Sequence, residues 1–151
     1  MPKSIGWDER GTAGENARAQ LPALAGAYFQ AGRKILRAGK APAELHPFRL
    51  KTKRLRYTLE LFRGCYGPSF EQRIEALKEI QTLLGEINDC AAALRVARKA
   101  LAARSAHRRA VERFLKARAS RLAAGFRKHW RETFDAEGKE DWWVGYLARK
   151  S

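Results

Sequence analysis

Cationic side chains are aligned within residues 45–62 (LHPFRLKTKRLRYTLELF), a segment that otherwise has the pattern of a core-forming helix. At about 100° per residue, one histidine and three cations fall on one face at spacings of three and four. Like charges this close repel one another by a few tenths of a kcal/mol per pair, and by more where water is removed. A multiply charged anion would compensate this repulsion. We name these residues the basic stripe: His46, Arg49, Lys53 and Arg56.

Apolar residues border the basic stripe on both sides. Glu60 lies in line with the stripe, but one carboxylate cannot balance three cations. We therefore expect the stripe to line a basic cavity between helices, where a lower dielectric strengthens the attraction for phosphate. The alternatives are a solvated basic face and, for His46, a histidine bonded to backbone at the helix start. One apolar face, the predicted core side, comprises Phe48, Leu55, Leu59, Phe62 and Tyr66; the weaker one, expected to meet a second neighbour or another chain, comprises Leu50, Tyr57 and Leu61.

The composition indicates which partners to consider. The chain has 31 Lys and Arg against 16 Asp and Glu, a net charge of +15 and a pI near 10.5. This charge favours polyanions, namely polyphosphate, nucleic acid or an acidic membrane surface. No apolar run has the length of a membrane-spanning helix, and the first residues lack the apolar segment of a signal peptide. We therefore expect a cytoplasmic protein that does not bind membranes.

Catalytic equipment is not evident in the sequence. There is no glycine-rich phosphate loop, no pair of carboxylates at metal spacing, and no nucleophile beside a base. Cys65 and Cys90 are neither in CxxC spacing nor near a histidine pair, so they indicate two reduced thiols. We expect no enzyme activity, no metal and no cofactor.

Helical periodicity dominates the chain, and no stretch shows the alternation of a strand. We predict an all-α protein, an antiparallel bundle of about four helices. The predicted domain covers residues 14–134, between a flexible lead at 1–13 and a short tail at 135–151 in which Trp142 and Trp143 pack on the bundle. The expected helices span residues 15–37, with a kink or a late start at Pro22, then about 43–66, 70–102 and 105–134.

Two motifs in consecutive predicted helices resemble the CHAD family, the conserved histidine α-helical domain. The first is H-x-x-R-x-x-x-K-R-L-R-Y, matched from His46 to Tyr57 with Arg54 in the second cationic pair. The second is Q-x-L-L-G-x-x-x-D, matched by Gln81, Leu84, Gly85 and Asp89. The resemblance covers about residues 44–100. It implies an all-helical module that binds inorganic polyphosphate through a basic cavity, found on polyphosphate granules or beside triphosphate-hydrolysing domains.

The chain departs from a full-length CHAD domain in size. Such a domain has two related helical halves, whereas this chain has room for one, and His107 does not begin a second motif. Either one half works with a smaller site, or two chains form a homodimer with a paired cavity; we expect the homodimer. RNA or DNA binding is the alternative function, followed by metal chelation or phosphate acceptance by histidine.

Further basic residues are candidates for the same site. Arg54 and Arg63 accompany the stripe on its own helix. Arg33 and Arg37 precede the turn before His46 and are expected at the cavity mouth. Arg95, aligned with Gln81 and Asn88, is expected either to face the stripe or to belong to a polar line that fixes the register of the helix. Arg118 and His129 are expected on the apolar side of the fourth helix, whose outer row, a solvated face, comprises Arg109, Arg113, Lys116, Arg127 and Arg131.

Overall fold

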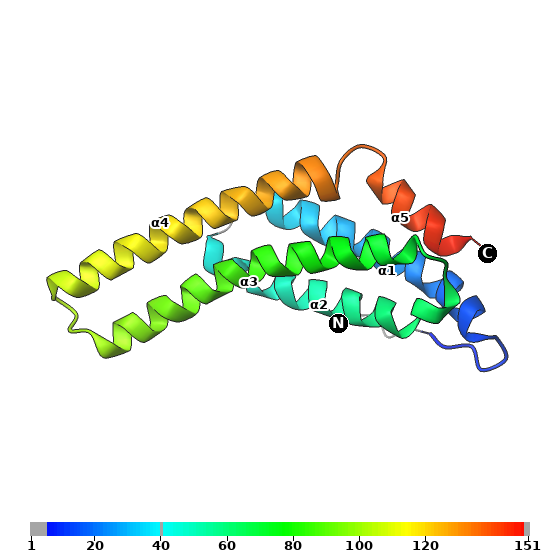
Figure 1. The fold of residues 1–151 in the computed structure, drawn as a ribbon, viewed down its shortest axis with the longest axis horizontal. Coiled ribbons are helices and arrows are strands. Elements are labelled where there is room, and N and C mark those ends of the chain that lie inside the picture. The colour runs from blue at the N-terminus through cyan, green and yellow to red at the C-terminus, as the bar shows by residue number, and fades with distance from the viewer. Residues whose placement is uncertain (1–5, 40, 150–151) are drawn as a thin grey trace.

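The structure is a computed structural model that describes residues 6–39 and 41–149. Within those residues it is all-α, without a strand, which confirms the predicted fold class (Figure 1). A short fifth helix adds to the four that were predicted. The elements are α1 (Ala13–Ala38), the 3₁₀ turn η1 (Pro42–Leu45), α2 (His46–Leu61), the 3₁₀ turn η2 (Arg63–Cys65), α3 (Phe70–Ala100), α4 (Ala106–His129), the π-helical turn η3 (Trp130–Phe134) and α5 (Lys139–Ala148).

Side chains and glycine define the ends of the long helices. The Thr12 hydroxyl accepts a hydrogen bond from the Glu15 amide (3.1 Å) and caps the start of α1. At the other end Gly39 has φ 59°, a left-handed conformation that favours glycine. Pro22 lies inside α1, so the expected late start is wrong. The Ser105 hydroxyl caps α4, accepting from the Arg108 amide (3.1 Å).

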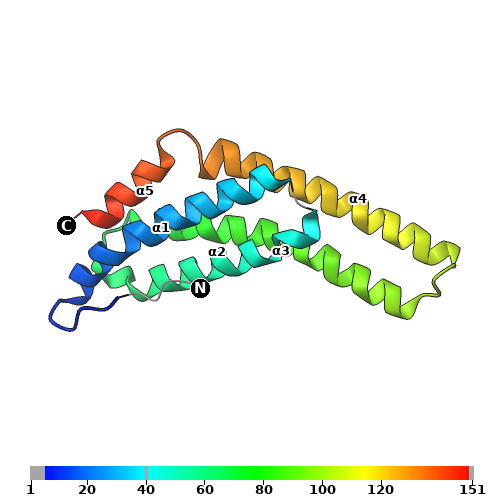
Figure 2. The same cartoon turned by 180° about the vertical axis from the view of Figure 1, so that it is seen from behind.

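Helices α1 to α4 pack in consecutive pairs, α1 with α2, α2 with α3 and α3 with α4, and α5 packs on α1 (Figure 1). The distal part of the α3–α4 hairpin projects beyond α1 and α2 in both views (Figure 2). Among residues 95–121, all of which the structure describes, Ala97 is the one buried residue. We name this segment the arm. Because no helix outside the hairpin covers the arm, the apolar Val111 is 37% exposed.

An aromatic cluster around Trp130 forms the centre of the core. The Trp130 ring packs on Phe134 at 4.7 Å between centroids, on Phe48 at 5.6 Å and on Tyr28 at 5.7 Å. Gly32 of α1 faces this indole: a Cβ at that position would stand 2.1 Å from the ring. The missing side chain therefore lets α1 approach the turn that follows α4.

The two ends of the described chain contact the bundle. Before α1, the Asp8 amide donates to the Asn16 side-chain oxygen (2.6 Å). After η3, Trp143 of α5 is buried, as expected for a segment packed on the bundle. Arg18 of α1 donates to the Arg149 carbonyl (2.7 Å). Residues 1–5 of the predicted lead and 150–151 of the predicted tail lie outside the described residues.

A buried arginine holds α5 against α3. Arg73 is 1% exposed, and its guanidinium lies 3.5 Å from the centre of the Trp142 ring and 3.8 Å from that of Tyr146. It donates to the carbonyls of Ser69 (2.9 Å) and Trp142 (2.7 Å). Burial lowers the pKa of Arg73 to about 10, because the charge has lost most of its water. The two rings and two carbonyls partly replace that hydration.

Candidate functional site

Helix α2 holds the basic stripe by burying the opposite face. The predicted core residues Phe48, Leu55, Leu59 and Phe62 are buried, which fixes the rotation of the helix. Thr52, also buried, donates to the Phe48 carbonyl (2.9 Å) and accepts from the Tyr28 hydroxyl of α1 (2.7 Å). Burial raises the pKa of Tyr28 above its ordinary value. This bonded pair sets the register of α2 against α1.

Two arginines of the basic stripe, Arg49 and Arg56, are partly buried. The Nε atoms of Arg49 and Arg56 are inaccessible to solvent, as is the side-chain oxygen of Gln81 on α3. Within the described part of the chain, none of the three atoms has a hydrogen-bond partner. Arg49 reaches Gly85 of α3, with its Nε 3.9 Å from the position a Cβ there would occupy. These inaccessible Nε atoms cannot contact a ligand directly, so an anion would have to bind the other nitrogen atoms of the two guanidinium groups.

One carboxylate lies near the stripe. Glu60 is 3.7 Å from Arg56, an (i, i+4) pair at the long end of the ion-pair range. The Arg56 guanidinium also lies 4.7 Å from the centre of the Tyr57 ring. Among the described residues, Arg49 and Lys53 have no ion pair. The stripe therefore keeps most of its positive charge.

The other predicted members of α2 differ in exposure. His46, the first residue of the helix, is exposed, and Lys53 is half-buried. Arg54 is exposed. Arg63 lies beyond α2 in η2 and forms an ion pair with Glu71. The helix thus presents His46, Arg49, Lys53 and Arg56 in one row, while Arg63 is engaged by a carboxylate.

The weaker apolar face of α2 is open. Leu50 and Tyr57 are each 50% exposed, and Leu61 is 81% exposed. No helix within residues 6–39 and 41–149 covers these residues, so no described helix is the second neighbour expected for this face. The basic stripe consequently has the buried core on one side and an exposed apolar edge on the other.

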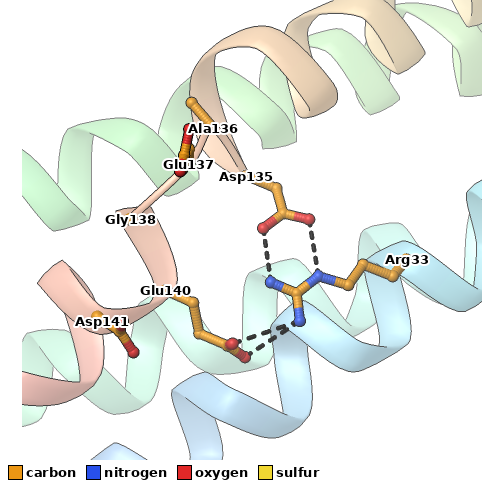
Figure 3. A pocket seen from close by; sticks show the side chains of 7 residues that line it. All are labelled: Arg33, Asp135, Ala136, Glu137, Gly138, Glu140 and Asp141. Atoms are coloured by element: carbon orange, nitrogen blue, oxygen red, sulfur yellow. Dashed lines mark hydrogen bonds and ion pairs between the residues drawn. The ribbon is translucent and has the colours of Figure 1, made fainter.

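Arg33 lies in a cavity formed by carboxylates rather than by the stripe. The cavity, about 350 Å³, lies where η3 leads into α5 (Figure 3). Arg33 binds both carboxylate oxygens of Asp135, at 2.8 and 2.7 Å, and Glu140 at 3.3 Å. Its hydrogen bonds to Asp135 raise the pKa of the guanidinium. These ion pairs join α1 to the C-terminal part of the bundle, so the positive charge of Arg33 is already compensated.

His129 lines a second cavity of about 180 Å³, between α3, η3 and α5. Its Nε2 is 3.6 Å from a carboxylate oxygen of Glu79, and Trp142 and Trp143 lie on the same cavity wall. Neither described cavity includes a residue of the basic stripe. Arg49 of the stripe lies at the α2–α3 contact, and a basic cavity around the stripe stays a prediction.

The remaining candidates lie on exposed surfaces. Arg37 is exposed in the last turn of α1. Arg95 and Arg118 are exposed on the arm. The expected placement of Arg118 on an apolar side is wrong, because the arm has no neighbouring helix at that face. Whether these three residues contribute to binding stays a prediction.

Sequence reasoning gave no role to Gly85 and only a tentative one to Gln81. The signal for Gly85 was its position inside a 31-residue helix, where glycine lowers helix stability relative to alanine and therefore suggests a close contact. The burial of the Gln81 oxygen depends on how deeply α2 packs, and one helix pattern does not contain that information.

Metal and membrane sites were also considered. Within residues 6–39 and 41–149, no group of three or more His, Cys, Asp or Glu has an arrangement suited to a metal ion. Over the same residues, no helix combines the length and apolar character needed to cross a membrane.

Comparison with known proteins gives one match. A family model described as the CHAD domain matches residues 6–98, which include α1, α2 and nearly all of α3. No curated protein and no solved structure matches the chain significantly. The matched region contains the whole basic stripe together with Gln81 and Gly85.

Proposed function

This chain belongs to the CHAD domain family, and from that premise we propose that it binds inorganic polyphosphate through the basic stripe without catalysing a reaction. CHAD domains are associated with polyphosphate binding and metabolism. The specific site and its mechanism are our proposal.

The observation that carries the proposal is the largely uncompensated positive charge of the basic stripe. Among the described residues Arg49 and Lys53 have no ion pair, and the row of His46, Arg49, Lys53 and Arg56 has one carboxylate nearby, Glu60, at 3.7 Å from Arg56. A chain of phosphates supplies acceptor oxygens and negative charge at short intervals. Charge-assisted hydrogen bonds from partly buried guanidinium groups to phosphate are stronger than those between neutral groups. Polyphosphate thus supplies the acceptor oxygens and the negative charge that this row of cations lacks.

Nucleic acid fits the basic stripe less well. A recognition helix places exposed side chains in a groove, and single-strand binding uses serial stacking aromatics. On α2 the exposed aromatic residue is Tyr57, already beside Arg56, and Arg49 lies against Gly85 of α3. A thin, flexible anion reaches such an edge more readily than a wide duplex does.

A titration of long-chain polyphosphate at about 0.15 M salt tests the proposal, with RNA of equal charge as competitor. We expect Arg49→Ala, Lys53→Ala and Arg56→Ala each to weaken polyphosphate binding, and the triple variant to weaken it most. Binding should also weaken as salt rises, since each phosphate contact releases counterions.

The matched control removes the same charge from α4. Arg109→Ala, Arg113→Ala and Lys116→Ala are three exposed substitutions outside the family match. This arm triple should leave polyphosphate affinity nearly unchanged. Equal loss in both triples would mean that net charge alone attracts the ligand. Unchanged polyphosphate affinity in the stripe triple, or equal affinity of the arm triple for polyphosphate and for RNA, would refute the specific site.

We also propose a homodimer, in which the exposed edge of Leu50, Tyr57 and Leu61 is covered by a second chain. Light scattering of the wild type should give twice the monomer mass, and Leu61→Glu should give a monomer. A monomeric wild type would contradict this part. For location we propose polyphosphate granules, beside a triphosphate-hydrolysing protein; a fluorescent fusion that stays diffuse in cells containing granules would argue against it.

A further inference from the structure

The arm, residues 95–121, carries a charge that the proposed polyphosphate site does not use. It contains ten Lys and Arg against one acidic residue, a local charge of +9 out of +15 for the whole chain. The family match includes Arg95 and Arg98 and none of the later cations. The cations are Arg95, Arg98, Lys99, Arg104, Arg108, Arg109, Arg113, Lys116, Arg118 and Arg121.

The charge of the arm is not balanced within the chain. Glu112 binds Arg108 at 2.9 Å and Arg98 at 3.4 Å, and these bonds, that of Arg108 above all, hold the pKa of Glu112 below its usual range. Among the described residues, the eight other cations of the arm have no ion pair. The compensating anion must therefore come from outside the protein.

The arrangement of these cations opposes the stability of the helices. Arg109 and Arg113 are like charges four residues apart, a spacing that brings side chains together on a helix. The first turn of α4 contains Arg108 and Arg109 and no acidic residue, although the positive end of the helix dipole favours acids there. The arm has almost no buried residue to offset these repulsions. Cations that lower the stability of their own helices indicate a role in binding.

The shape of the arm points to a wide ligand. Both helices of the hairpin carry cations, and the hairpin projects from the bundle with solvent on several sides (Figures 1 and 2). The part of α4 within the arm, residues 106–121, is about 24 Å long at 1.5 Å per residue. Duplex nucleic acid presents one phosphate charge per about 1.7 Å of axis, roughly fourteen phosphates over that length. Two cationic helices side by side match such a cylinder better than they match a single thin chain.

Single strands and membranes fit the arm less well. Sequence-tolerant single-strand binding uses several stacking aromatics, whereas Phe114, 61% exposed, is the one aromatic residue in the arm. A helix that lies in a membrane interface has a continuous apolar face opposite its cations. On α4 the exposed Phe114 shares a face with Ala110, Ala117 and Arg121, and the charge of Arg121 interrupts that face, so a continuous apolar face is absent.

We propose that the arm is a second, separate binding surface, which holds the phosphate backbone of double-stranded nucleic acid without sequence preference. The polyphosphate site and the arm then lie on different parts of the molecule. A chain bearing both would tether duplex nucleic acid to polyphosphate.

The test measures two ligands on two variants. A fluorescein-labelled 20-base-pair DNA duplex and long-chain polyphosphate are each titrated at about 0.1 M KCl, within the range where phosphate contacts respond strongly to salt. The arm triple Arg109→Ala/Arg113→Ala/Lys116→Ala should weaken duplex binding by at least about tenfold, and reduce the salt slope of log K by about 2.7. Its polyphosphate affinity should stay near that of the wild type. Circular dichroism confirms that the exposed substitutions leave the helices intact.

The stripe triple Arg49→Ala/Lys53→Ala/Arg56→Ala gives the reciprocal result: polyphosphate binding is lost and duplex binding is kept. Wild-type duplex affinity in the arm triple would overturn the proposal, as would equal loss of both ligands in both variants. A third titration uses vesicles of anionic phospholipid. If the arm triple lost vesicle binding but kept duplex binding, the surface would be a membrane site and the proposal wrong. Failure of the stripe triple to affect polyphosphate would refute the proposed function alone.

Discussion

Replacement of Gly32 by alanine tests the packing that brings α1 against the end of α4. A Cβ at position 32 would stand 2.1 and 2.2 Å from two carbons of the Trp130 ring. Non-bonded carbons normally stay about 3.5–4.0 Å apart, so the indole would have to move by at least about 1 Å. The ring is held by its contacts with Tyr28, Phe48 and Phe134 and has little room to do so.

Two opposing effects set the magnitude. Added volume in a well-packed core costs about 1–3 kcal/mol, whereas exchanging glycine for alanine within a helix gains about 0.5–1 kcal/mol. Gly26 provides a matched control on the same helix, because a Cβ there would meet no atom within 4 Å. Gly26→Ala should therefore gain stability and Gly32→Ala should lose about 1–2 kcal/mol. The difference between the two variants isolates the steric cost.

Urea unfolding followed by tryptophan fluorescence measures both variants. With a slope of about 1–3 kcal/mol per molar urea, the Gly32→Ala midpoint should fall by about 0.5–1 M while the Gly26→Ala midpoint rises. If both variants were stabilised equally, the close contact between α1 and Trp130 would not exist in solution, and the reasoning would be refuted.

Three further predictions concern residues described above. Arg73→Ala should destabilise the fold by about 2–5 kcal/mol through lost carbonyl bonds and ring contacts, and Arg73→Lys should not restore it, since an ammonium cannot stack flat between two rings; wild-type urea stability of Arg73→Lys would contradict this. Because burial raises the pKa of Tyr28, above about pH 10 the unfolded chain loses a proton that the folded chain keeps, and stability falls by up to about 1.4 kcal/mol per pH unit. Tyr28→Phe should reduce the slope of unfolding free energy against pH, measured by urea titrations between about pH 9 and pH 11. An unchanged slope would count against this role of Tyr28. Gly85→Ala leaves room for Arg49 and should preserve polyphosphate affinity, whereas Gly85→Leu should displace the guanidinium and weaken binding; equal affinities by titration would show that Arg49 does not need that space.

The local pattern of α2 was sufficient to predict its buried face. Phe48, Leu55 and Leu59 recur at helical spacing, and an apolar face of a helix has to be covered whatever the neighbours are. The alignment of Arg49 with Arg56 follows from the same geometry. Fold class and the row of the basic stripe were therefore accessible from the sequence.

Other features depend on partners far along the chain. Arg33 looked like a neighbour of the stripe, but Asp135 and Glu140, more than 100 residues away, bind it. Val111 and Phe126 belong to the same apolar pattern on α4. Phe126 is buried, whereas Val111 is exposed because it lies where the α3–α4 hairpin extends beyond the other helices. An enclosed cavity was inferred from apolar neighbours of the stripe, and one of those neighbours, Leu61, is in solvent. Helix length relative to the rest of the bundle is a tertiary property.

The contact between α1 and α5 also governs when the protein can finish folding. Trp143 of α5 packs on Phe29 of α1, with 6.1 Å between ring centres, and Tyr66 donates to the carbonyl of Leu147 (2.9 Å). The ribosome completes α1 roughly 100 residues before it reaches the end of α5, a delay of about 5–20 s at usual rates of synthesis. During that interval the apolar side of α1 lacks its last cover. The nascent chain is therefore expected to need chaperone protection until its final helix is made.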